Sequence, residues 1–580
     1  MRSASFRALL SLAAALCPLS ISAQPVIDGD LGEWTQPLYT DVQGDGAPVD
    51  FGRFWATSDQ GYLYLAFETG AEINLQSFNE LMVYVDTDDN PATGQAVAGI
   101  GAELAYAFGQ RQGTVTLPGR SPAPVSHAQV GLFSAPTVTA DRFEVAFPRD
   151  VTIGGQPVFT GPSVRIVLRN GTAGDVLPDA AGSLQLVLRT DAVARQAVEI
   201  DRDQPESLRV LTYNVLRDGL FSVQQTEAFR RIFRATMPDV IALQEVYLHS
   251  SAEVAARLNE LLPGTTWYAA GVAGSDVFVA ARSPIVETVP LCVLPSAPST
   301  CNVAVRLDLR PRTSAGLYVV SMHPACCSND RFRQEDFDFL AAHIRDARAS
   351  GAIPAQMPVI VAGDMNLVGD RRQVRTLLEG DILDNARFGP DAPPDADGTA
   401  FADAAPLTTG RPTTFTWINA ADAFPPGRLD YIAYSDALLT PANAFALYTP
   451  GLTPDELARY GLVATDTDVS DHLPLVQDFA FRPTTAVEEG GGAAGLTLAP
   501  PAPNPARGRA TVQFSLVGPS PVRVSLIDPL GRTVRVIVDG QRGAGPHEVT
   551  LDTAGLAPGV YLLRLDASGH HVVRQLTLVR

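Results

Sequence analysis

The first part of the chain alternates apolar and polar residues over short runs. Turns rich in Gly, Pro and Asp separate these runs. The runs at 62–67 and 81–85 are examples of this pattern. Short runs of this kind are typical of half-buried strands in an all-β protein. Residues 24–200 are therefore predicted to fold as an all-β sandwich.

The pattern changes over residues 206–483, where short apolar strands alternate with helical periodicity. Strands are predicted at 240–243, 317–320 and 359–362, and helices near 226–236 and 331–347. The first helix has Ser222 and Gln225 at the spacing of a capping box. The second places Phe337, Leu340, Ala341 and Ile344 on one face. This alternation predicts an α/β domain of about 280 residues.

Two further segments complete the domain organisation. Residues 484–499 contain the run Glu-Glu-Gly-Gly-Gly-Ala-Ala-Gly, which predicts a flexible linker. Residues 500–580 return to short strands with glycine turns, which predicts a small β-sandwich. The expected fold class is multidomain, with a central α/β part flanked by an N-terminal all-β sandwich and a small C-terminal one.

The N-terminus has the features of an export signal. Arg2 and Arg7 precede an apolar stretch at 8–19, and Ala23 is a small residue suited to cleavage. Residues 1–23 are therefore predicted to be a signal peptide. No later apolar run reaches about eighteen residues, so no transmembrane helix is expected in the mature chain.

Four cysteines remain after this segment: Cys292, Cys301, Cys326 and Cys327. In an oxidising compartment they are candidates for disulfides. The neighbours Cys326 and Cys327 can either close a bridge with each other or pair elsewhere. Six histidines, among them His127, belong to no motif and are predicted to lie on the surface.

Composition and charge narrow the function. Hydrophobic residues make up 46% of the chain and charged residues 18%, which excludes long disorder. All 43 basic residues are arginine and stand against 63 acidic residues, for a net charge of −20. Such a surface does not attract polyanions at long range. Nucleic acid is therefore expected only as a substrate held at a local site.

Polar side chains recur at the ends of the apolar strands of the central domain. They are Asn214, Glu245, His323, Asp364, Asn366, Asp430, Asp471 and His472. Strand ends at one edge of a sheet converge, and loops there carry function. If these ends share an edge, four carboxylates and two imidazoles meet in one cleft.

The negative charge of such a cluster must be compensated, because like charges about 4 Å apart repel by about 4 kcal/mol at an effective dielectric near 20. Protons or a divalent cation supply this compensation. Oxygen ligands without cysteine favour Mg²⁺, Mn²⁺ or Ca²⁺ over zinc. Imidazoles beside carboxylates titrate near neutral pH, and the combination suits attack of water on phosphorus.

Six segments in this region resemble the motifs of a known family. They are Leu211-Thr-Tyr-Asn-Val215, Leu243-Gln-Glu-Val246, Ser321-Met-His323, Ala362-Gly-Asp-Met-Asn366, Arg428-Leu-Asp-Tyr431 and Val469-Ser-Asp-His472. In this order they resemble the endonuclease/exonuclease/phosphatase family, which includes deoxyribonuclease I-like nucleases and secreted sphingomyelinases. The resemblance covers roughly 206–482 and implies a four-layer α/β sandwich with the site at one end.

The resemblance also implies a metal site. Asn214 and Glu245 resemble the family's metal-site pair, with Glu245 as the direct ligand, and Asp471 resembles a second ligand. The implied ion is Mg²⁺ or Mn²⁺.

The remaining residues take the implied catalytic roles. Asp430 would orient and charge His472, and together they act as base or phosphate stabiliser. Asp364 would position or deprotonate the attacking water, and Asn366 would hold a phosphate oxygen. His323 is the candidate general acid or phosphate donor. The identity of the general base stays open.

The N-terminal region carries a second resemblance. Residues 26–34 resemble the opening of family 9-like carbohydrate-binding and DOMON-like β-sandwich modules, which implies a carbohydrate ligand. The Asp-rich segment 86–90 is either a Ca²⁺ site or a hairpin turn. Trp34 and Trp55 are predicted to pack in the core rather than stack on sugar.

The C-terminal segments 501–505, 527–534 and 556–562 resemble the type A sorting domain of the type IX secretion system. The resemblance implies the type IX secretion machinery as a partner and a secreted or cell-surface location.

These observations favour a secreted metal-dependent phosphoesterase acting on a phosphodiester substrate, with an extracellular nuclease as the first hypothesis. The alternative is a phospholipid or sphingomyelin phosphodiesterase. A third hypothesis, from another class, is a non-catalytic surface adhesin on an inactive phosphoesterase fold.

Overall fold

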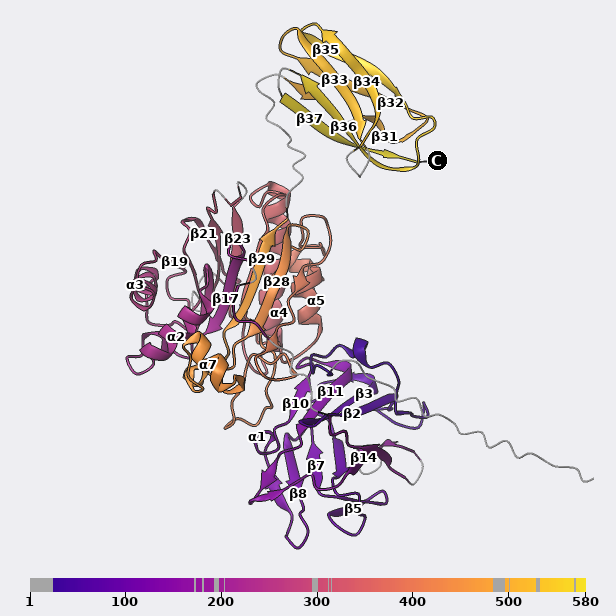
Figure 1. Ribbon diagram of the computed structural model, residues 1–580, viewed down its shortest axis with the longest axis vertical. Helices are drawn as coiled ribbons and strands as arrows, with labels where there is room; N and C mark the ends of the chain where they lie inside the picture. Colours follow the sequence, from indigo (N-terminus) through magenta and orange to yellow (C-terminus); the bar gives the residue numbers. More distant parts are fainter. Residues whose placement is uncertain are drawn as a thin grey trace, which may run out of the picture. The chain divides into compact units, whose positions relative to one another are not determined.

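The computed structural model describes residues 24–171, 174–179, 182–191, 198–202, 204–294, 301–310, 312–313, 316–482, 496–499, 501–527, 532–567 and 570–579. The chain divides into two units, Met1–Ala480 and Phe481–Arg580, which are described separately (Figure 1). The predicted signal peptide and most of the predicted linker lie outside the described residues.

The N-terminal part of the first unit consists of two sheets and short hairpins. One sheet has the order β1-β2-β3-β11-β10, and the other has the order β15-β14-β4-β7-β8-β9, with β16 on β14. The strands of the first sheet are β1 (Tyr39–Thr40), β2 (Arg53–Ser58), β3 (Tyr62–Ile73), β10 (Phe133–Ala135) and β11 (Ala140–Pro148). Those of the second are β4 (Leu81–Asp86), β7 (Leu104–Ala107), β8 (Gln112–Val115), β9 (Ala123–Val125), β14 (Ser163–Asn170), β15 (Val176–Leu177) and β16 (Leu184–Val187). Two hairpins are β5 (Gln95–Val97) with β6 (Ile100–Ala102) and β12 (Thr152–Ile153) with β13 (Gln156–Pro157), and a short helix is α1 (His127–Val130).

The two sheets bury a shared apolar core, which confirms the predicted all-β sandwich. Leu65 and Phe67 of β3 and Val83 of β4 have no exposed surface. Trp34 and Trp55 are also buried, as predicted, and Trp34 Nε1 donates a 2.6 Å hydrogen bond to Glu144 Oε1. Because both rings are covered, neither offers a stacking surface for a sugar.

Two sheets and their helices form the central part of the first unit. The first sheet has the order β19-β20-β18-β17-β29-β28-β26, and the second has the order β21-β22-β23-β24-β27-β25. The strands of the first are β17 (Leu208–Asn214), β18 (Val240–Gln244), β19 (Tyr268–Gly271), β20 (Phe278–Ala281), β26 (Leu407–Thr408), β28 (Leu439–Ala446) and β29 (Leu475–Phe481). Those of the second are β21 (Ile285–Leu291), β22 (Asn302–Leu307), β23 (Leu317–Met322), β24 (Val359–Asp364), β25 (Ala402–Asp403) and β27 (Asp430–Tyr434). The helices are α2 (Thr226–Thr236), α3 (Ser251–Leu261), α4 (Asp330–Ser350), α5 (Arg372–Glu379), α6 (Asn385–Phe388) and α7 (Pro454–Tyr460).

Helices cover the outer face of each sheet, which confirms the predicted four layers (Figure 1). The parallel pairs β17–β18 and β23–β24 are connected through α2 and α4, because a parallel pair needs a crossover. Phe229 and Phe233 of α2 pack on the first sheet, and Phe337 and Ile344 of α4 pack on the second. The apolar face predicted for 331–347 is thus the buried face of α4.

The predicted capping box at the start of α2 is wrong. The N-cap residue is Gln225, and its side chain makes no capping hydrogen bond. Gln225 Nε2 instead donates to the carbonyl of Val469 at 3.3 Å, and Ser222 ends the preceding 3₁₀ turn. The Gln225 amide therefore bonds to a distant loop and does not cap the helix.

The sandwich contacts loops of the central part at several points. The Phe133 and Phe415 rings stack with centroids 5.6 Å apart. Thr137 Oγ1 donates to the carbonyls of Leu367 at 2.8 Å and Arg428 at 3.2 Å. Residues 367 and 428 lie beside the predicted site residues Asn366 and Asp430, so the sandwich braces two loops of the candidate site.

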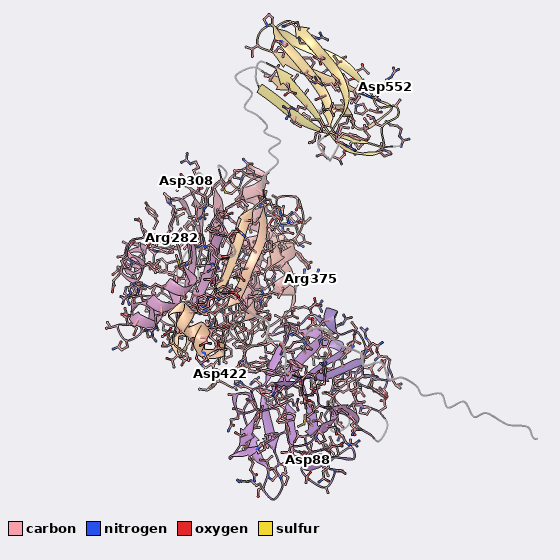
Figure 2. The ribbon with its side chains drawn as sticks, viewed as in Figure 1. Asp88, Arg282, Asp308, Arg375, Asp422 and Asp552 are labelled. Carbon is pink, nitrogen blue, oxygen red and sulfur yellow. A yellow bond between two sulfur atoms is a disulfide. The ribbon has the colours of Figure 1, made fainter. Side chains whose placement is uncertain are left out.

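His127 takes part in the same contact, contrary to its predicted surface position. It is only 1% exposed, and its Nε2 lies 3.0 Å from the carbonyl oxygen of Asp422. Figure 2 labels Asp422 on the loop that reaches toward the sandwich. The loop that carries Asp422 thus covers His127. The sequence around His127 does not predict this burial, because the covering loop lies far away in the chain.

The second unit is a small all-β domain with the sheet order β30-β32-β31-β37-β36-β33-β34 and β35 on β32. Its strands are β30 (Thr497–Leu498), β31 (Ala502–Arg507), β32 (Arg509–Leu516), β33 (Ser520–Ile527), β34 (Thr533–Arg542), β35 (Gly545–Asp552), β36 (Gly559–Ala567) and β37 (His570–Leu578). Its core includes Val524, Leu563 and Leu576. Over the described residues, no helix is both long and apolar enough to cross a bilayer.

Candidate active site

Strand pairing in the first sheet brings Asn214 and Glu245 to one edge. Asn214 ends β17 and pairs with Gln244, the last residue of the parallel strand β18. Glu245 follows directly with φ +61°, a conformation that turns its side chain away from the strand direction. Asn214 Nδ2 donates to Glu245 Oε1 at 3.1 Å.

The second sheet contributes the residues at the ends of β23, β24 and β27. Met322 of β23 pairs with Gly363 of β24, so His323 and Asp364 follow at the same edge. The strand β27 runs antiparallel to β24, and its first residue, Asp430, pairs directly with Asp364. The two sheets thus present their polar ends to each other.

Asp364 is the centre of this arrangement. Its Oδ2 accepts a 3.0 Å hydrogen bond from Asn214 Nδ2 and lies 3.4 Å from His472 Nε2 and 3.5 Å from His323 Nε2. The residue is 2% exposed. Side chains from both sheets therefore meet at one carboxylate oxygen.

His472 is held by a second carboxylate. Its Nδ1 lies 2.8 Å from Asp430 Oδ2, and both side chains are buried. Burial alone lowers the pKa of His472, but the charges of Asp430 and Asp364 outweigh it and raise the pKa to about 10. Burial raises the pKa of Asp430, and His472 opposes that rise. The proton of the pair therefore resides on the imidazole at neutral pH.

His323 is held in the same way by Asp276. Its Nδ1 lies 2.6 Å from Asp276 Oδ2. Burial lowers the pKa of His323, but the Asp276 hydrogen bond and the charges of Asp364, Asp276 and Glu245 raise it to about 9. The site thus contains two imidazoles, each with its own carboxylate.

Asp276 is a site residue that the sequence analysis missed. It precedes the apolar run 277–281, which contains β20. Because β20 is antiparallel to β18, its beginning lies at the edge where β18 ends. Asp276 could have been predicted in the same way as Asp430, because each is a carboxylate directly before an apolar strand.

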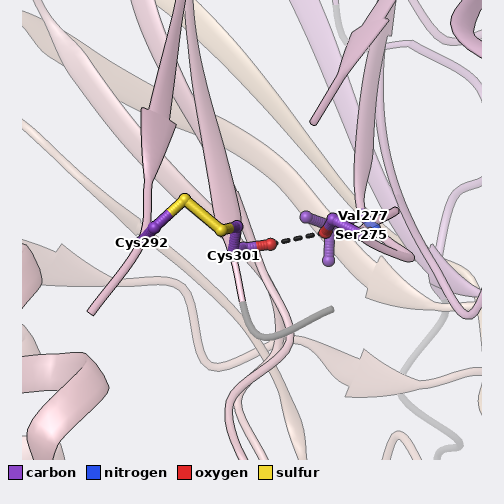
Figure 3. Close-up of a disulfide and its surroundings, with 4 residues drawn as sticks. All are labelled: Ser275, Val277, Cys292 and Cys301. Atoms are coloured by element: carbon purple, nitrogen blue, oxygen red, sulfur yellow. Dashed lines mark hydrogen bonds between the residues drawn. A yellow bond between two sulfur atoms is a disulfide. The ribbon is translucent and has the colours of Figure 1, made fainter. Parts of the chain in front are cut away.

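A disulfide supports the loop that carries Asp276 (Figure 3). Cys292 and Cys301 are bonded across the β21–β22 hairpin. Ser275 Oγ donates to the carbonyl of Cys301, and Val277 N donates to Ser275 Oγ at 3.3 Å. The next residue, Asn302, accepts a 2.8 Å hydrogen bond from His323 N. The bonded hairpin therefore contacts both the loop that carries Asp276 and His323 itself.

The other two cysteines follow the His323 loop. Cys326 and Cys327 are both free and exposed. The expectation that they form disulfides, with each other or elsewhere, is thus wrong.

Asn366 and Asp471 are placed differently from the residues above. Asn366 Nδ2 donates to the carbonyl of Pro324 at 3.0 Å, so its side chain holds the loop after His323. The backbone carbonyl of Asp471 accepts a 2.8 Å hydrogen bond from Ile418 N. In the described part of the chain, its carboxylate is not among the groups of acidic and histidine side chains close enough to share an ion.

The donor chemistry fits a hard divalent cation at Glu245. Glu245 is half-buried, and its Oε2 accepts a 2.9 Å hydrogen bond from Arg217 N. Carboxylate oxygens are preferred by Mg²⁺ and similar ions, and Asn214 Nδ2 holds the Glu245 carboxylate in place through its hydrogen bond to Oε1. Asp364, Asp430 and His472 form a second group whose ligand atoms lie within 4.8 Å of one another.

A family model covers this whole region. Residues 211–472 match the Endonuclease/Exonuclease/phosphatase family. They form an endonuclease/exonuclease/phosphatase domain. Members of the family are typically hydrolases that act on phosphodiesters and use divalent metals. The site of this endonuclease/exonuclease/phosphatase domain lies at the meeting edge of its two sheets.

A second model matches the end of the chain. Residues 502–579 match the Secretion system C-terminal sorting domain. The second unit is therefore a type IX sorting domain, and the protein that carries the endonuclease/exonuclease/phosphatase domain is secreted or located at the cell surface.

Several solved structures are similar to about half of the chain. The human Nocturnin catalytic domain with bound sulfate is 18% identical, with a TM-score of 0.32, and covers 48% of this chain and 97% of its own. Truncated TDP2 from Caenorhabditis elegans is 18% identical, with a TM-score of 0.33, and covers 48% and 99%. Sphingomyelinase C from Streptomyces griseocarneus is 20% identical, with a TM-score of 0.30, and covers 47% and 99%. No curated protein matches the chain.

Proposed function

We propose that the central domain is a secreted, divalent-metal-dependent phosphodiesterase and that extracellular nucleic acid is its first substrate class. The observation that carries the proposal is the convergence of Asn214, His323 and His472 on Asp364 Oδ2. Such a set can bind a phosphate and move a proton at one place.

The protonation of the two imidazoles supports a division of roles. The pKa values of His323 and His472 are raised to about 9 and about 10, so both are cationic donors at neutral pH. A cationic imidazole cannot accept a proton, which leaves Asp364 to position the attacking water and take its proton.

The donors act on the phosphate and the leaving group. His472, fixed by Asp430, donates a hydrogen bond to a phosphate oxygen. His323, fixed by Asp276, gives its proton to the departing oxygen. Water adds to phosphorus as the phosphorus–oxygen bond breaks, and the products are a phosphomonoester and an alcohol.

Glu245 would hold the metal directly, with Asn214 beside it, and the sequence motif implies Asp471 as a further ligand. A bound Mg²⁺ or Mn²⁺ offsets the negative charge of the phosphate. The half-buried Glu245 carboxylate is reachable from solvent, which supports its role as the direct ligand.

The surface beside the metal site bears on the substrate. Tyr247 lies two residues after Glu245 and is 50% exposed, so its ring offers a face on which a base can stack. The net charge of −20 favours local binding of this kind over a broad electrostatic interaction.

The same surface favours a second candidate, a phospholipid phosphodiesterase. Leu248 is 81% exposed and Val223 is 82% exposed. The two loops touch, because Phe221 stacks on His249 with ring centroids 3.5 Å apart. Exposed apolar residues at an active-site rim are suited to contact with a lipid surface.

A substrate panel tests the proposal on the full chain. Duplex DNA, single-stranded DNA, RNA and sphingomyelin vesicles are incubated with Mg²⁺ or Mn²⁺ at pH 5 to 9, with a chelator as control. We expect nucleic acid cleavage that the chelator abolishes. Vesicle hydrolysis alone would favour the lipid candidate, and no metal-dependent cleavage of any substrate would favour a non-catalytic adhesin.

Variants separate metal binding from proton transfer. Glu245→Gln and Asp471→Asn should weaken Mg²⁺ binding in titration calorimetry, whereas Asp364→Asn should lower kcat by at least about a hundredfold. The exposed Asp150→Asn serves as the matched control. Near-normal turnover of Asp364→Asn would refute the proposed role of that carboxylate.

A further inference from the structure

Five aspartates gather on the N-terminal sandwich, away from the strand ends that form the candidate active site. Asp41, Asp45 and Asp50 lie on the loop between β1 and β2, and Asp175 and Asp179 flank β15. Ligand atoms of Asp41, Asp175 and Asp179 all lie within 4.8 Å of one another, as do those of Asp45, Asp50 and Asp175. Because Asp175 belongs to both groups, the five carboxylates form one continuous cluster.

Asp41 is the residue that distinguishes this cluster from an ordinary acidic surface. It is only 4% exposed, and neither of its carboxylate oxygens accepts a hydrogen bond. Its oxygens instead face the carboxylates of Asp175 and Asp179. A buried carboxylate without a donor is strongly destabilised unless a cation or a proton compensates it.

Three of the other carboxylates are held in place by the backbone. Asp50 accepts from Gly44 N at 3.0 Å, and Asp175 accepts from Phe51 N at 2.6 Å and from Val176 N at 2.7 Å. Asp179 accepts from Val42 N at 3.2 Å. These hydrogen bonds fix the oxygens around Asp41 before any ligand binds.

Within the part of the chain that the structure describes, the cluster has no arginine as an ion-pair partner. Across the described residues, none of the five aspartates takes part in an ion pair. Burial and the neighbouring charges of Asp175 and Asp179 raise the pKa of Asp41 to about 8. The cluster thus has a deficit of positive charge that a cation can fill.

We propose that Asp41, Asp175 and Asp179 form a Ca²⁺ site, with Asp45 and Asp50 adding negative charge beside it through Asp175. Two oxygens bound to one Ca²⁺ at about 2.4 Å lie no more than about 4.8 Å apart, and the ligand atoms of Asp41, Asp175 and Asp179 satisfy this limit. Ca²⁺ takes about six to eight oxygen ligands and tolerates irregular geometry, whereas Mg²⁺ keeps several waters and needs a near-octahedral set. An all-carboxylate cluster at the surface of a secreted protein therefore suits Ca²⁺.

The ion would join the two sheets of the sandwich. The loop with Asp41, Asp45 and Asp50 connects strands of the first sheet, whereas Asp175 and Asp179 flank a strand of the second. This site is distinct from Asp86, Asp88 and Glu103, which form a separate group on the segment where the sequence allowed a Ca²⁺ site.

Thermal unfolding and titration calorimetry of the full chain test the proposal. After chelation, about 5 mM Ca²⁺ should raise the Tm of the sandwich transition by roughly 3 to 6 °C, and the same concentration of Mg²⁺ should not. An absent Ca²⁺ shift, or an equal shift with Mg²⁺, would overturn the proposal.

Variants assign the effect to this cluster. Asp41→Asn should abolish the Ca²⁺ shift and yet leave the metal-free Tm equal to or above that of the unchanged protein, because it removes an uncompensated buried charge. Asp88→Asn, in the separate group, and the exposed Asp150→Asn should keep the shift. A full Ca²⁺ shift in Asp41→Asn, or its loss in Asp150→Asn, would contradict the assignment.

Discussion

Oδ2 of Asp276 lies 2.6 Å from Nδ1 of His323, and the other nitrogen of that ring faces Asp364 Oδ2 at 3.5 Å. The imidazole is thus fixed between two carboxylates that come from different sheets. This placement repeats the relation of Asp430 to His472, so the candidate site contains two similarly held imidazoles.

Asp276→Asn should lower kcat about ten- to hundredfold while the protein stays folded. The substitution keeps an acceptor for Nδ1 but removes the charge that raises the pKa of His323. The alkaline limb of the pH–rate profile should therefore move to lower pH, a change that loss of packing alone would not cause.

The matched control for that variant is Asp308→Asn. Asp308 pairs with Arg310 at 2.5 Å and belongs to no part of the candidate site (Figure 2). A comparable loss of activity in Asp308→Asn, or an unchanged pH profile in Asp276→Asn, would refute the positioning role of Asp276.

The two histidines should make the metal-free protein lose stability as the pH rises. Both have folded-state pKa values above the unfolded value of about 6.5. Their contribution is complete below about pH 6.5 and is lost as the pH rises through about 9 for His323 and about 10 for His472. Denaturant unfolding of chelated protein at intervals from pH 6 to 10 measures this loss.

His472→Gln isolates the contribution of one imidazole. The difference in unfolding free energy between the unchanged protein and this variant should shrink as the pH rises above 6.5. A difference that stays constant up to pH 10 would show that the imidazole is not protonated in the folded state.

Removing the Cys292–Cys301 disulfide should impair both stability and catalysis. Replacing both cysteines by alanine should cost roughly 2 to 3 kcal/mol of unfolding free energy. Turnover should fall less than in Asp276→Asn, because Ser275 and Asn302 lose support but Asp276 remains. Unfolding and phosphodiesterase assays of both proteins, with and without reductant, check this.

The exposed free cysteines provide the control. Alanine at Cys326 and Cys327 should change the unfolding free energy by less than about 0.5 kcal/mol, as is usual for surface substitutions. Reductant should lower the unfolding free energy of the unchanged protein but not that of the variant in which Cys292 and Cys301 are replaced by alanine.

Thr137→Val should weaken the contact between the sandwich and the central part. The change keeps the shape of the side chain but removes the hydroxyl that serves the carbonyls of Leu367 and Arg428. Because the carbonyls then lack that donor, the free energy of unfolding should fall by about 1 to 3 kcal/mol, as denaturant unfolding measures. Thr152→Val on an exposed strand is the control, and equal effects of the two substitutions would contradict this role for Thr137.

Much of the fold was predictable because the determining signals are local. The apolar periodicity of α4 and the continuous apolar strands β18 and β24 are visible without any knowledge of their neighbours. Polar residues at strand ends likewise pointed to Asp364 and Asp430, since a shared sheet edge places such residues together.

The remaining features depend on contacts between residues far apart in the chain. Thr137 reaches residues about 230 and 290 positions away, and no local pattern encodes such a bond. The capping box at Ser222 failed because Ser222 ends the preceding 3₁₀ turn, and the Gln225 amide bonds to the distant Val469 carbonyl. Asp276 is the exception, since its strand-end position could have been read from the sequence.

The contact of Thr137 and Phe133 with central loops also limits how freely the chain can be recombined. Residues 206–482 produced alone would expose Phe415 and leave the Leu367 carbonyl without its threonine donor. The central part therefore depends on the sandwich for some of its packing and hydrogen bonds. A different β-sandwich in this position would keep these loops in place only if it supplied an aromatic ring and a hydroxyl where Phe133 and Thr137 lie.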